Sequence, residues 1–182
     1  MEIDLRRVPE PHKFHAEIVT STIVLDKIAA LRVTAWRANG GELPSFIERQ
    51  DIHNDEHEKH AVHFAVMRDV RPVAAAKMCI HAKAQECPDP ESLQGYEENL
   101  TTPIATFSRL VVHPDFRGLG LPALLLQGRI AIARERKCGS IVCVLEQQSR
   151  MKEMEGLGFK RLGPTKIRYL SYVESVVYML RM

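Results

Sequence analysis

Residues 104–137 limit what this chain can fold into more than any other stretch of its sequence. Residues 110–112 are apolar and mostly β-branched, which predicts a strand that ends at His113-Pro114. The turn that follows, 117–122, contains two glycines, and we expect a helix with Pro122 at its first position. The apolar face of this helix is made of Leu121, Leu124, Leu125 and Ile132.

A strand that leads through a glycine turn into a helix is able to hold an anion. The first N–H groups of the helix have no partner within it, its dipole adds positive charge, and glycine lets an anion approach the backbone. One such contribution is worth roughly 0.3–1 kcal/mol, so several must converge, and Arg117 adds a full charge. The turn lacks the Gly-Lys-Ser/Thr of a Walker loop and the acidic residue of a dinucleotide fingerprint. The alternative is an ordinary strand–turn–helix unit whose glycines only turn the chain.

The order Val-His-Pro-x-x-Arg-Gly-x-Gly, from Val112 to Gly120, resembles the acyl-CoA signature of the GNAT superfamily of N-acetyltransferases. That signature is Arg/Gln-x-x-Gly-x-Gly/Ala, and Arg117, Gly120 and Pro122 occupy its defined places. Pro122 departs from the pattern, because proline has no N–H group to donate. The resemblance implies acetyl-CoA, or another acyl-CoA, as cosubstrate. The residues implied to contact it are Leu110, Val111, Val112, Arg117, Gly118, Leu119, Gly120, Leu121, Pro122, Ala123 and Gln147.

The resemblance also implies the fold. We expect one domain, residues 1–182, of the α/β (α+β) class, with a mixed, mostly antiparallel sheet of six to seven strands. A central parallel strand–helix–strand unit and helices on both faces of the sheet complete this arrangement. The expected strands are 14–20, 62–67, 73–80, 104–112, 141–145, 159–161 and 176–181. The expected helices are 22–39, 44–52, 91–99, 122–138 and 147–157, and Gly139 is expected to cap the fourth of them.

Composition excludes several classes of function. A net charge of +2 without a Lys/Arg block argues against nucleic acid as a partner, and the longest apolar runs are far too short to span a membrane. The four cysteines form no Cys-x-x-Cys pair, so a cytoplasmic location is the expectation. The final strand often joins subunits in the resembled family, which leaves a homodimer open.

Four histidines lie close together at His53, His57, His60 and His63. Spacings of four and three residues would align metal ligands on one face of a helix. The run changes, however, from helix-like to strand-like spacing, which would scatter the rings. We therefore favour a solvated loop that leads into a strand, and no metal is expected.

The catalytic groups are the weakest part of the resemblance. Many relatives carry a Glu on the central strand and a Tyr in the last helix, where this chain has Ser108 and Met154. Glu146, which follows a buried strand, is the first candidate general base, and its alternative role is that of a surface or capping carboxylate. Ser108 and Tyr96 are the other candidates; Tyr96 lies in the polar stretch 81–102, which is either a substrate-recognition segment or a surface insertion.

The function that these features imply is transfer of an acetyl or other acyl group from acyl-CoA to an amine by direct nucleophilic attack. The acceptor is expected to be a small molecule or a peptide. The alternative is a non-catalytic domain that binds or senses acyl-CoA, because both of the family's usual acid–base residues are missing.

Overall fold

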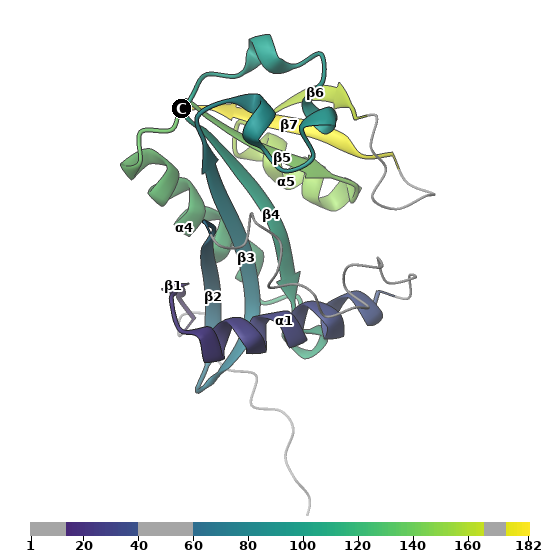
Figure 1. The fold of residues 1–182 in the computed structure, drawn as a ribbon. Helices are drawn as coiled ribbons and strands as arrows, with labels where there is room; N and C mark the ends of the chain where they lie inside the picture. The colour runs from purple at the N-terminus through teal and green to yellow at the C-terminus, as the bar shows by residue number, and fades with distance from the viewer. Residues whose placement is uncertain (1–13, 40–59, 166–173) are drawn as a thin grey trace, which may run out of the picture.

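A computed structural model describes residues 14–39, 60–165 and 174–182 of the chain. Within them, seven strands form one sheet in the order β1-β2-β3-β4-β5-β7-β6 (Figure 1). All neighbouring strands are antiparallel except β4 and β5, so the expected mixed sheet with one central parallel pair is confirmed. The strands are β1 (Ala16–Val19), β2 (Val62–Arg68), β3 (Arg71–His81), β4 (Ile104–Val112), β5 (Ser140–Leu145), β6 (Lys160–Pro164) and β7 (Val176–Arg181).

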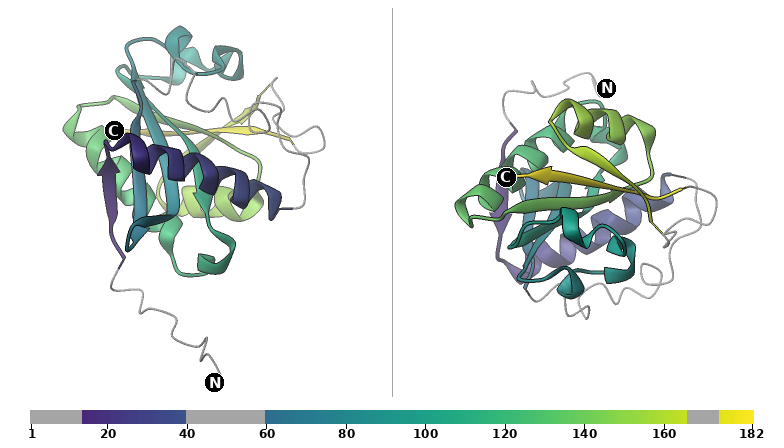
Figure 2. Two further views of the ribbon diagram at one scale, coloured as in Figure 1. Left: turned by 60° about the horizontal axis from the view of Figure 1, so that its bottom comes forward. Right: turned by 90° about the horizontal axis from the view of Figure 1, so that it is seen from above.

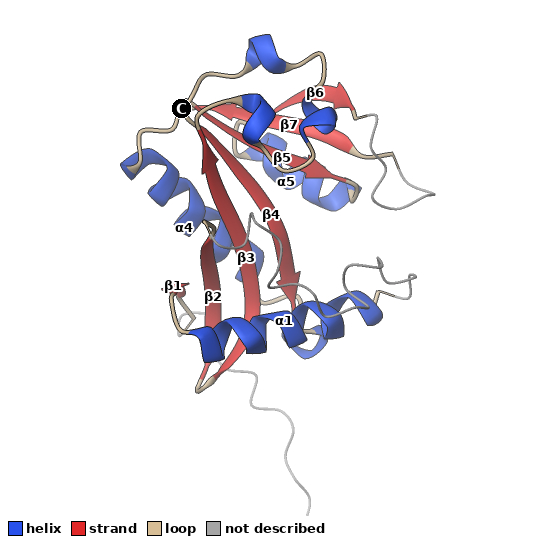
Figure 3. Cartoon of the chain, viewed as in Figure 1, coloured by secondary structure: helices blue, strands red, loops and turns tan. Residues whose placement is uncertain are grey.

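Helices cover both faces of this sheet, as the views of Figures 2 and 3 show. Helix α1 (Thr22–Arg37) packs on one face, which we call the α1 face, through a core cluster that includes Ala65, Ala75 and Val111. Helices α4 (Leu121–Glu135) and α5 (Gln148–Gly156) pack on the opposite face around the largest core cluster. The short 3₁₀ turns are η3 (Ala84–Glu86), η4 (Pro90–Leu93), η5 (Glu97–Asn99) and η6 (Pro114–Phe116).

The segment between β3 and β4 covers the rest of the α1 face. Leu93 and Cys87 from this segment pack with Ile104, Val142 and Val177 of the sheet in a third core cluster. The single helix expected over 91–99 does not form, because two separate 3₁₀ turns, η4 and η5, flank the left-handed Gly95 (φ 89°). The helix expected over 44–52 lies outside the described residues.

The two parallel strands part within the sheet. Phe107 of β4 and Cys143 of β5 are their last aligned pair. Beyond that pair, β4 continues beside β3, while β5 continues beside β7. We call the place where they separate the β4–β5 fork; its two arms are residues 108–112 of β4 and 144–145 of β5.

A bulge in β4 lies at the beginning of this fork. Arg109 has a positive φ of 55°, and the register with β3 shifts so that Ser108 faces Lys77 while Val111 faces Ala75. One residue of β3 is therefore opposite two residues of β4, which reverses the alternation of the strand. As a result Leu110 packs with the α4 cluster and Val111 with the α1 cluster.

The ends of α4 differ from the expectation by a few residues. Leu121 is its first residue and Pro122 its second, after Gly120 as N-cap with φ 72°. At the other end, Lys137 rather than Gly139 adopts the left-handed conformation, with φ 54°. Gly139 is required for a different reason: a Cβ there would lie 2.6 Å from Thr101 Cγ2.

Candidate active site

The glycine turn presents several backbone N–H groups at the start of α4. Gly118 and Gly120 both have positive φ, 78° and 72°, a conformation that costs other residues roughly 1–2 kcal/mol. Within the described part of the chain, the N–H groups of residues 118–121 donate to no backbone carbonyl. Ala123, in contrast, donates its N–H to the Gly120 carbonyl at 3.0 Å. The N–H groups of residues 118–121 are therefore available to a ligand, whereas the N–H group of Ala123 is not.

Arg117 attaches this turn to the end of α1. Its Nη2 donates to Asn39 Oδ1 at 2.9 Å and to the Ala35 carbonyl at 3.4 Å. The residue remains exposed to solvent. The sequence indicated a charge beside the turn, and the structure adds that the same guanidinium fixes the turn against a helix that is distant in the sequence.

The outer part of β4 offers backbone groups to the fork. The His113 N–H donates to the Val73 carbonyl of β3 at 2.9 Å. Because successive N–H groups of a strand point to opposite edges, the Val112 N–H points away from β3, toward the β5 side. The Val112 N–H is therefore on the open side of β4, whereas the Val111 N–H faces β3.

Ser108 is the first residue of β4 beyond the pairing with β5, and it begins a polar row on the α1 face. Its partner across β3 is Lys77, and the partner of Lys77 across β2 is His63. Lys77 is only 2% and His63 only 6% exposed, while Ser108 is half-buried. Close to this row, His81 Nε2 lies 3.2 Å from Thr106 Oγ1. Sequence reasoning missed this polar row, because its members come from three strands.

Glu146 follows β5 at the outer end of the fork, and Ser175 holds it in place. The Ser175 hydroxyl donates to Glu146 Oε1 at 2.8 Å, and Ser175 is completely buried just before β7. Gln147 is exposed as the N-cap of α5, where its carbonyl accepts the N–H groups of Arg150 and Met151 at 3.0 and 3.1 Å. The fork thus has one carboxylate with a fixed orientation at the end of β5.

Tyr96 is bonded to the edge strand β6. Its hydroxyl donates to the Pro164 carbonyl of β6 at 2.8 Å, and its ring packs in the third core cluster. This side chain attaches the segment between β3 and β4 to the edge of the sheet.

The α4 side of the fork is a buried cluster with one cation. Phe107 and Cys143, the last aligned pair, belong to the same core cluster as Met154 of α5, which is 2% exposed. Arg129 of α4 is 3% exposed, and its guanidinium carbon lies 4.5 Å from the centre of the Phe107 ring. Burial lowers the pKa of Arg129 to about 9, and burial raises the pKa of the Cys143 thiol to about 12.

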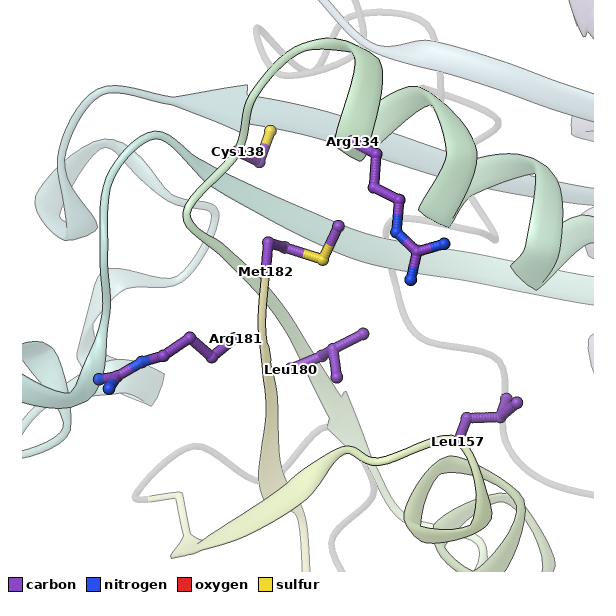
Figure 4. Close-up of a pocket in the computed structure, with 6 residues that line it drawn as sticks. All are labelled: Arg134, Cys138, Leu157, Leu180, Arg181 and Met182. Carbon is purple, nitrogen blue, oxygen red and sulfur yellow. The ribbon is translucent and has the colours of Figure 1, made fainter.

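A pocket of about 330 Å³ lies elsewhere, where the end of α4 meets the end of β7 (Figure 4). It is lined by Arg134, Cys138, Leu157, Leu180, Arg181 and Met182. None of the expected site residues contributes to it.

The described residues contain no group of three or more His, Cys, Asp or Glu side chains arranged to hold a metal. His53 and His57 lie outside the described residues, His60 is exposed, and His63 is buried in β2. Among the described helices, none has the length and apolar character required to cross a membrane.

Known proteins share this fold and part of this sequence. Residues 25–159 match the model of the acetyltransferase (GNAT) family. FeeM, an N-acyl amino acid synthase from uncultured soil microbes, superposes with a TM-score of 0.70 at 14% identity, covering 93% of this chain and 90% of FeeM. The ribosomal-protein-S18-alanine N-acetyltransferase of Escherichia coli gives 0.61 at 16% identity, with 92% and 93% coverage.

The PaiA N-acetyltransferase of Thermoplasma acidophilum, solved in complex with coenzyme A, gives a TM-score of 0.61 at 11% identity, covering 92% of this chain and 99% of that chain. No curated protein matches this sequence. At these identities the solved structures establish the fold, whereas the family model covers well over half of the chain. The chain therefore belongs to the acetyltransferase (GNAT) family.

Proposed function

We propose that this protein is an acyl-CoA-dependent N-acyltransferase that transfers an acetyl or other acyl group to an amine of a small molecule or peptide. One arrangement supports this proposal more than any other. The free N–H groups of residues 118–121 follow the arm of the fork that carries the Val112 N–H, and the short turn η6 and its flanking residues lie between them. A turn able to bind an anion and a strand edge with an available donor are therefore close together in the chain.

In this proposal the turn binds the diphosphate of the donor. The N–H groups of residues 118–121 donate to its oxygens, and the dipole of α4 adds positive charge. Pro122 contributes no donor and only continues the helix. Residues 110–112 align the pantetheine arm, and the Val112 N–H polarises the thioester carbonyl as negative charge develops on its oxygen.

The acceptor amine is proposed to approach from the α1 face, where Ser108 and the polar row lie. An amine with a pKa of about 10.4 is neutral in only about one molecule in 10³ at pH 7, which costs roughly 4–5 kcal/mol. Holding amine and thioester together supplies about 7–11 kcal/mol, so positioning outweighs this cost. Glu146, oriented by Ser175, accepts the proton directly or through water.

Two of the similar structures support an amine as acceptor. FeeM is described as an N-acyl amino acid synthase, and the Escherichia coli enzyme as an S18-alanine N-acetyltransferase. A cytoplasmic location is part of the proposal, supported by the cysteines, all four of which are free thiols.

Calorimetric titration with acetyl-CoA tests donor binding. Replacing Gly120 by Val, or Arg117 by Glu, is expected to weaken binding at least tenfold, because the first forces a strained turn and the second places a negative charge beside the diphosphate. Arg136→Glu is the matched control, since this exposed arginine lies at the opposite end of α4. Unchanged affinity in both turn variants, with native thermal unfolding, would refute the proposal.

The second candidate function is a non-catalytic domain that binds or senses acyl-CoA. Met154, buried where relatives carry a tyrosine, favours it, because a thioether cannot donate a proton. Release of free thiol from acetyl-CoA over a panel of amines separates the two functions. Turnover with any amine supports the transferase, and tight binding without turnover supports the sensor.

A further inference from the structure

Arg129 is a buried cation with almost no polar partners. The residue is 3% exposed and packs against Phe107 of the sheet. Its Nε donates to the Leu125 carbonyl of its own helix at 3.3 Å, and its guanidinium lies over the Phe107 ring. Among the described residues, no carboxylate lies within ion-pair distance of it; the nearby Glu153 is paired with Arg150.

Such a side chain is costly in the folded protein unless an anion joins it. Burial is the main reason that its pKa falls to about 9, and the charge of Arg150 lowers it further, while Glu153 acts in the opposite direction. A buried charge without an ion-pair partner destabilises a fold, and such groups gather at functional sites. An anion beside this guanidinium would offset the cost of its burial.

The position of Arg129 connects it to the fork. Phe107, whose ring it covers, is one half of the last aligned pair of β4 and β5. The bond to the Leu125 carbonyl folds the side chain back toward the start of α4, where the glycine turn lies. From Gly120 to Arg129 the helix rises about 13 Å, at about 1.5 Å per residue. The glycine turn and Arg129 therefore lie along the same helix, the turn at its start and Arg129 about 13 Å further along it.

We propose that Arg129 is a catalytic residue that stabilises the thiolate of coenzyme A as it leaves. This inference rests on the proposed transferase function. In the step, the amine nitrogen forms a bond to the thioester carbon, and the carbon–sulfur bond breaks with its electron pair moving to sulfur. The amine proton passes to Glu146 or to water. The thiolate then lies beside the guanidinium and later takes a proton from water.

Three neighbouring groups are not available to protonate or stabilise the leaving thiolate. Met154 has no proton to donate. The Cys143 thiol stays protonated, because burial raises its pKa to about 12. The Tyr178 hydroxyl donates to Glu155 Oε1 at 2.8 Å, so it has a structural partner. Arg129 contacts Phe107 of the last aligned pair, and an arginine gives charge-assisted hydrogen bonds that strengthen as charge develops on sulfur.

The first test measures binding without turnover. Coenzyme A and desulfo-coenzyme A differ only at the sulfur, so calorimetry with both isolates its contribution. We expect the wild-type protein to bind coenzyme A about 10-fold or more tightly than desulfo-coenzyme A, with a preference that grows from pH 7 to pH 8.5 as the free thiol ionises. Arg129→Met is expected to remove this preference, and Arg129→Lys to retain part of it.

The second test measures turnover of the full chain with acetyl-CoA and any amine that the panel identifies. Arg129→Met is expected to lower kcat about 10- to 100-fold while KM for acetyl-CoA changes less than about threefold, because the charge forms only in the transition state. Ile130→Met, a change of similar size at the next residue of α4, controls for disturbance of the core. Thermal unfolding of each variant checks that it is folded.

The outcomes separate this inference from the proposed function. If neither the wild-type protein nor any variant binds or uses acetyl-CoA, the proposed function fails. If acetyl-CoA is bound and used but Arg129→Met keeps both its kcat and its preference for coenzyme A over desulfo-coenzyme A, only the role of Arg129 is overturned. A loss confined to donors with a charged acyl group, such as succinyl-CoA, would also overturn it, because the guanidinium would then recognise the acyl group.

Discussion

The hydroxyl of Tyr96 donates a hydrogen bond of 2.8 Å to the carbonyl of Pro164, which lies 68 residues further along the chain. A side chain at Gly163 would collide with the same hydroxyl. The tyrosine therefore fits against the backbone of β6 and fixes the segment between β3 and β4 to the sheet. Tyr96, which the sequence offers as a candidate catalytic residue, therefore also has a structural role in the fold.

Tyr96→Phe is expected to lower stability without impairing chemistry. Loss of one hydrogen bond costs about 0.5–1.5 kcal/mol, measurable by urea unfolding, while kcat with acetyl-CoA stays within about twofold. Gly163→Ala provides the cross-check, since it is expected to destabilise the wild-type protein more than the Tyr96→Phe variant. A tenfold fall in kcat with unchanged stability would instead give Tyr96 a role in the reaction.

Pro122→Ala is expected to tighten binding of coenzyme A. The change restores an N–H group at the second residue of α4, next to four donors that are already free. One further hydrogen bond to a charged group is worth about 1.5–3 kcal/mol, which corresponds to roughly 10-fold or more in Kd by calorimetry. Pro90→Ala, at an exposed turn remote from the loop, is the control. Equal or weaker binding by the alanine form would argue that this position faces away from the diphosphate.

Arg129→Met is expected to stabilise the protein near neutral pH. Below pH 9 the arginine is charged in both the folded and the unfolded states, so the full cost of burying the charge is present. Between pH 9 and the ordinary pKa of 12.5, the folded state loses the proton first, and stability of the wild type rises. Urea unfolding from pH 7 to pH 10 is therefore expected to show an advantage of about 1–4 kcal/mol for the variant that shrinks above pH 9. If the variant were less stable than wild type at pH 7, the packing of the Arg129 side chain would outweigh the cost of burying its charge.

Substitutions after α4 are expected to act in opposite directions at two neighbouring sites. Lys137→Gly relieves a left-handed backbone, with φ 54°, and is expected to stabilise the protein by about 1 kcal/mol. Gly139→Ala places a Cβ against Thr101 and is expected to cost more than about 2 kcal/mol. Thermal unfolding of both variants checks this pair. If Lys137→Gly destabilised the protein and Gly139→Ala stabilised it, the helix cap would belong to Gly139 instead of Lys137.

Most strands could be predicted because the pattern that defines them is local. The expected strands 62–67, 73–80, 141–145 and 176–181 agree with β2, β3, β5 and β7 within a few residues. Residues 91–99 were predicted wrongly, because Gly95 with its positive φ and the packing of Leu93 and Tyr96 on the sheet divide that segment into two turns.

The sequence by itself determined the strand, glycine turn and helix of residues 104–135, because positive φ at Gly118 and Gly120 and the apolar face of α4 depend only on nearby residues. Only the tertiary structure decided what faces the fork. The polar row of His63, Lys77 and Ser108 depends on strand register and on the bulge at Arg109. In the same way, nothing in the sequence distinguishes Arg129 from an ordinary helix residue, and its burial follows only from the packing of α4 on Phe107 of β4.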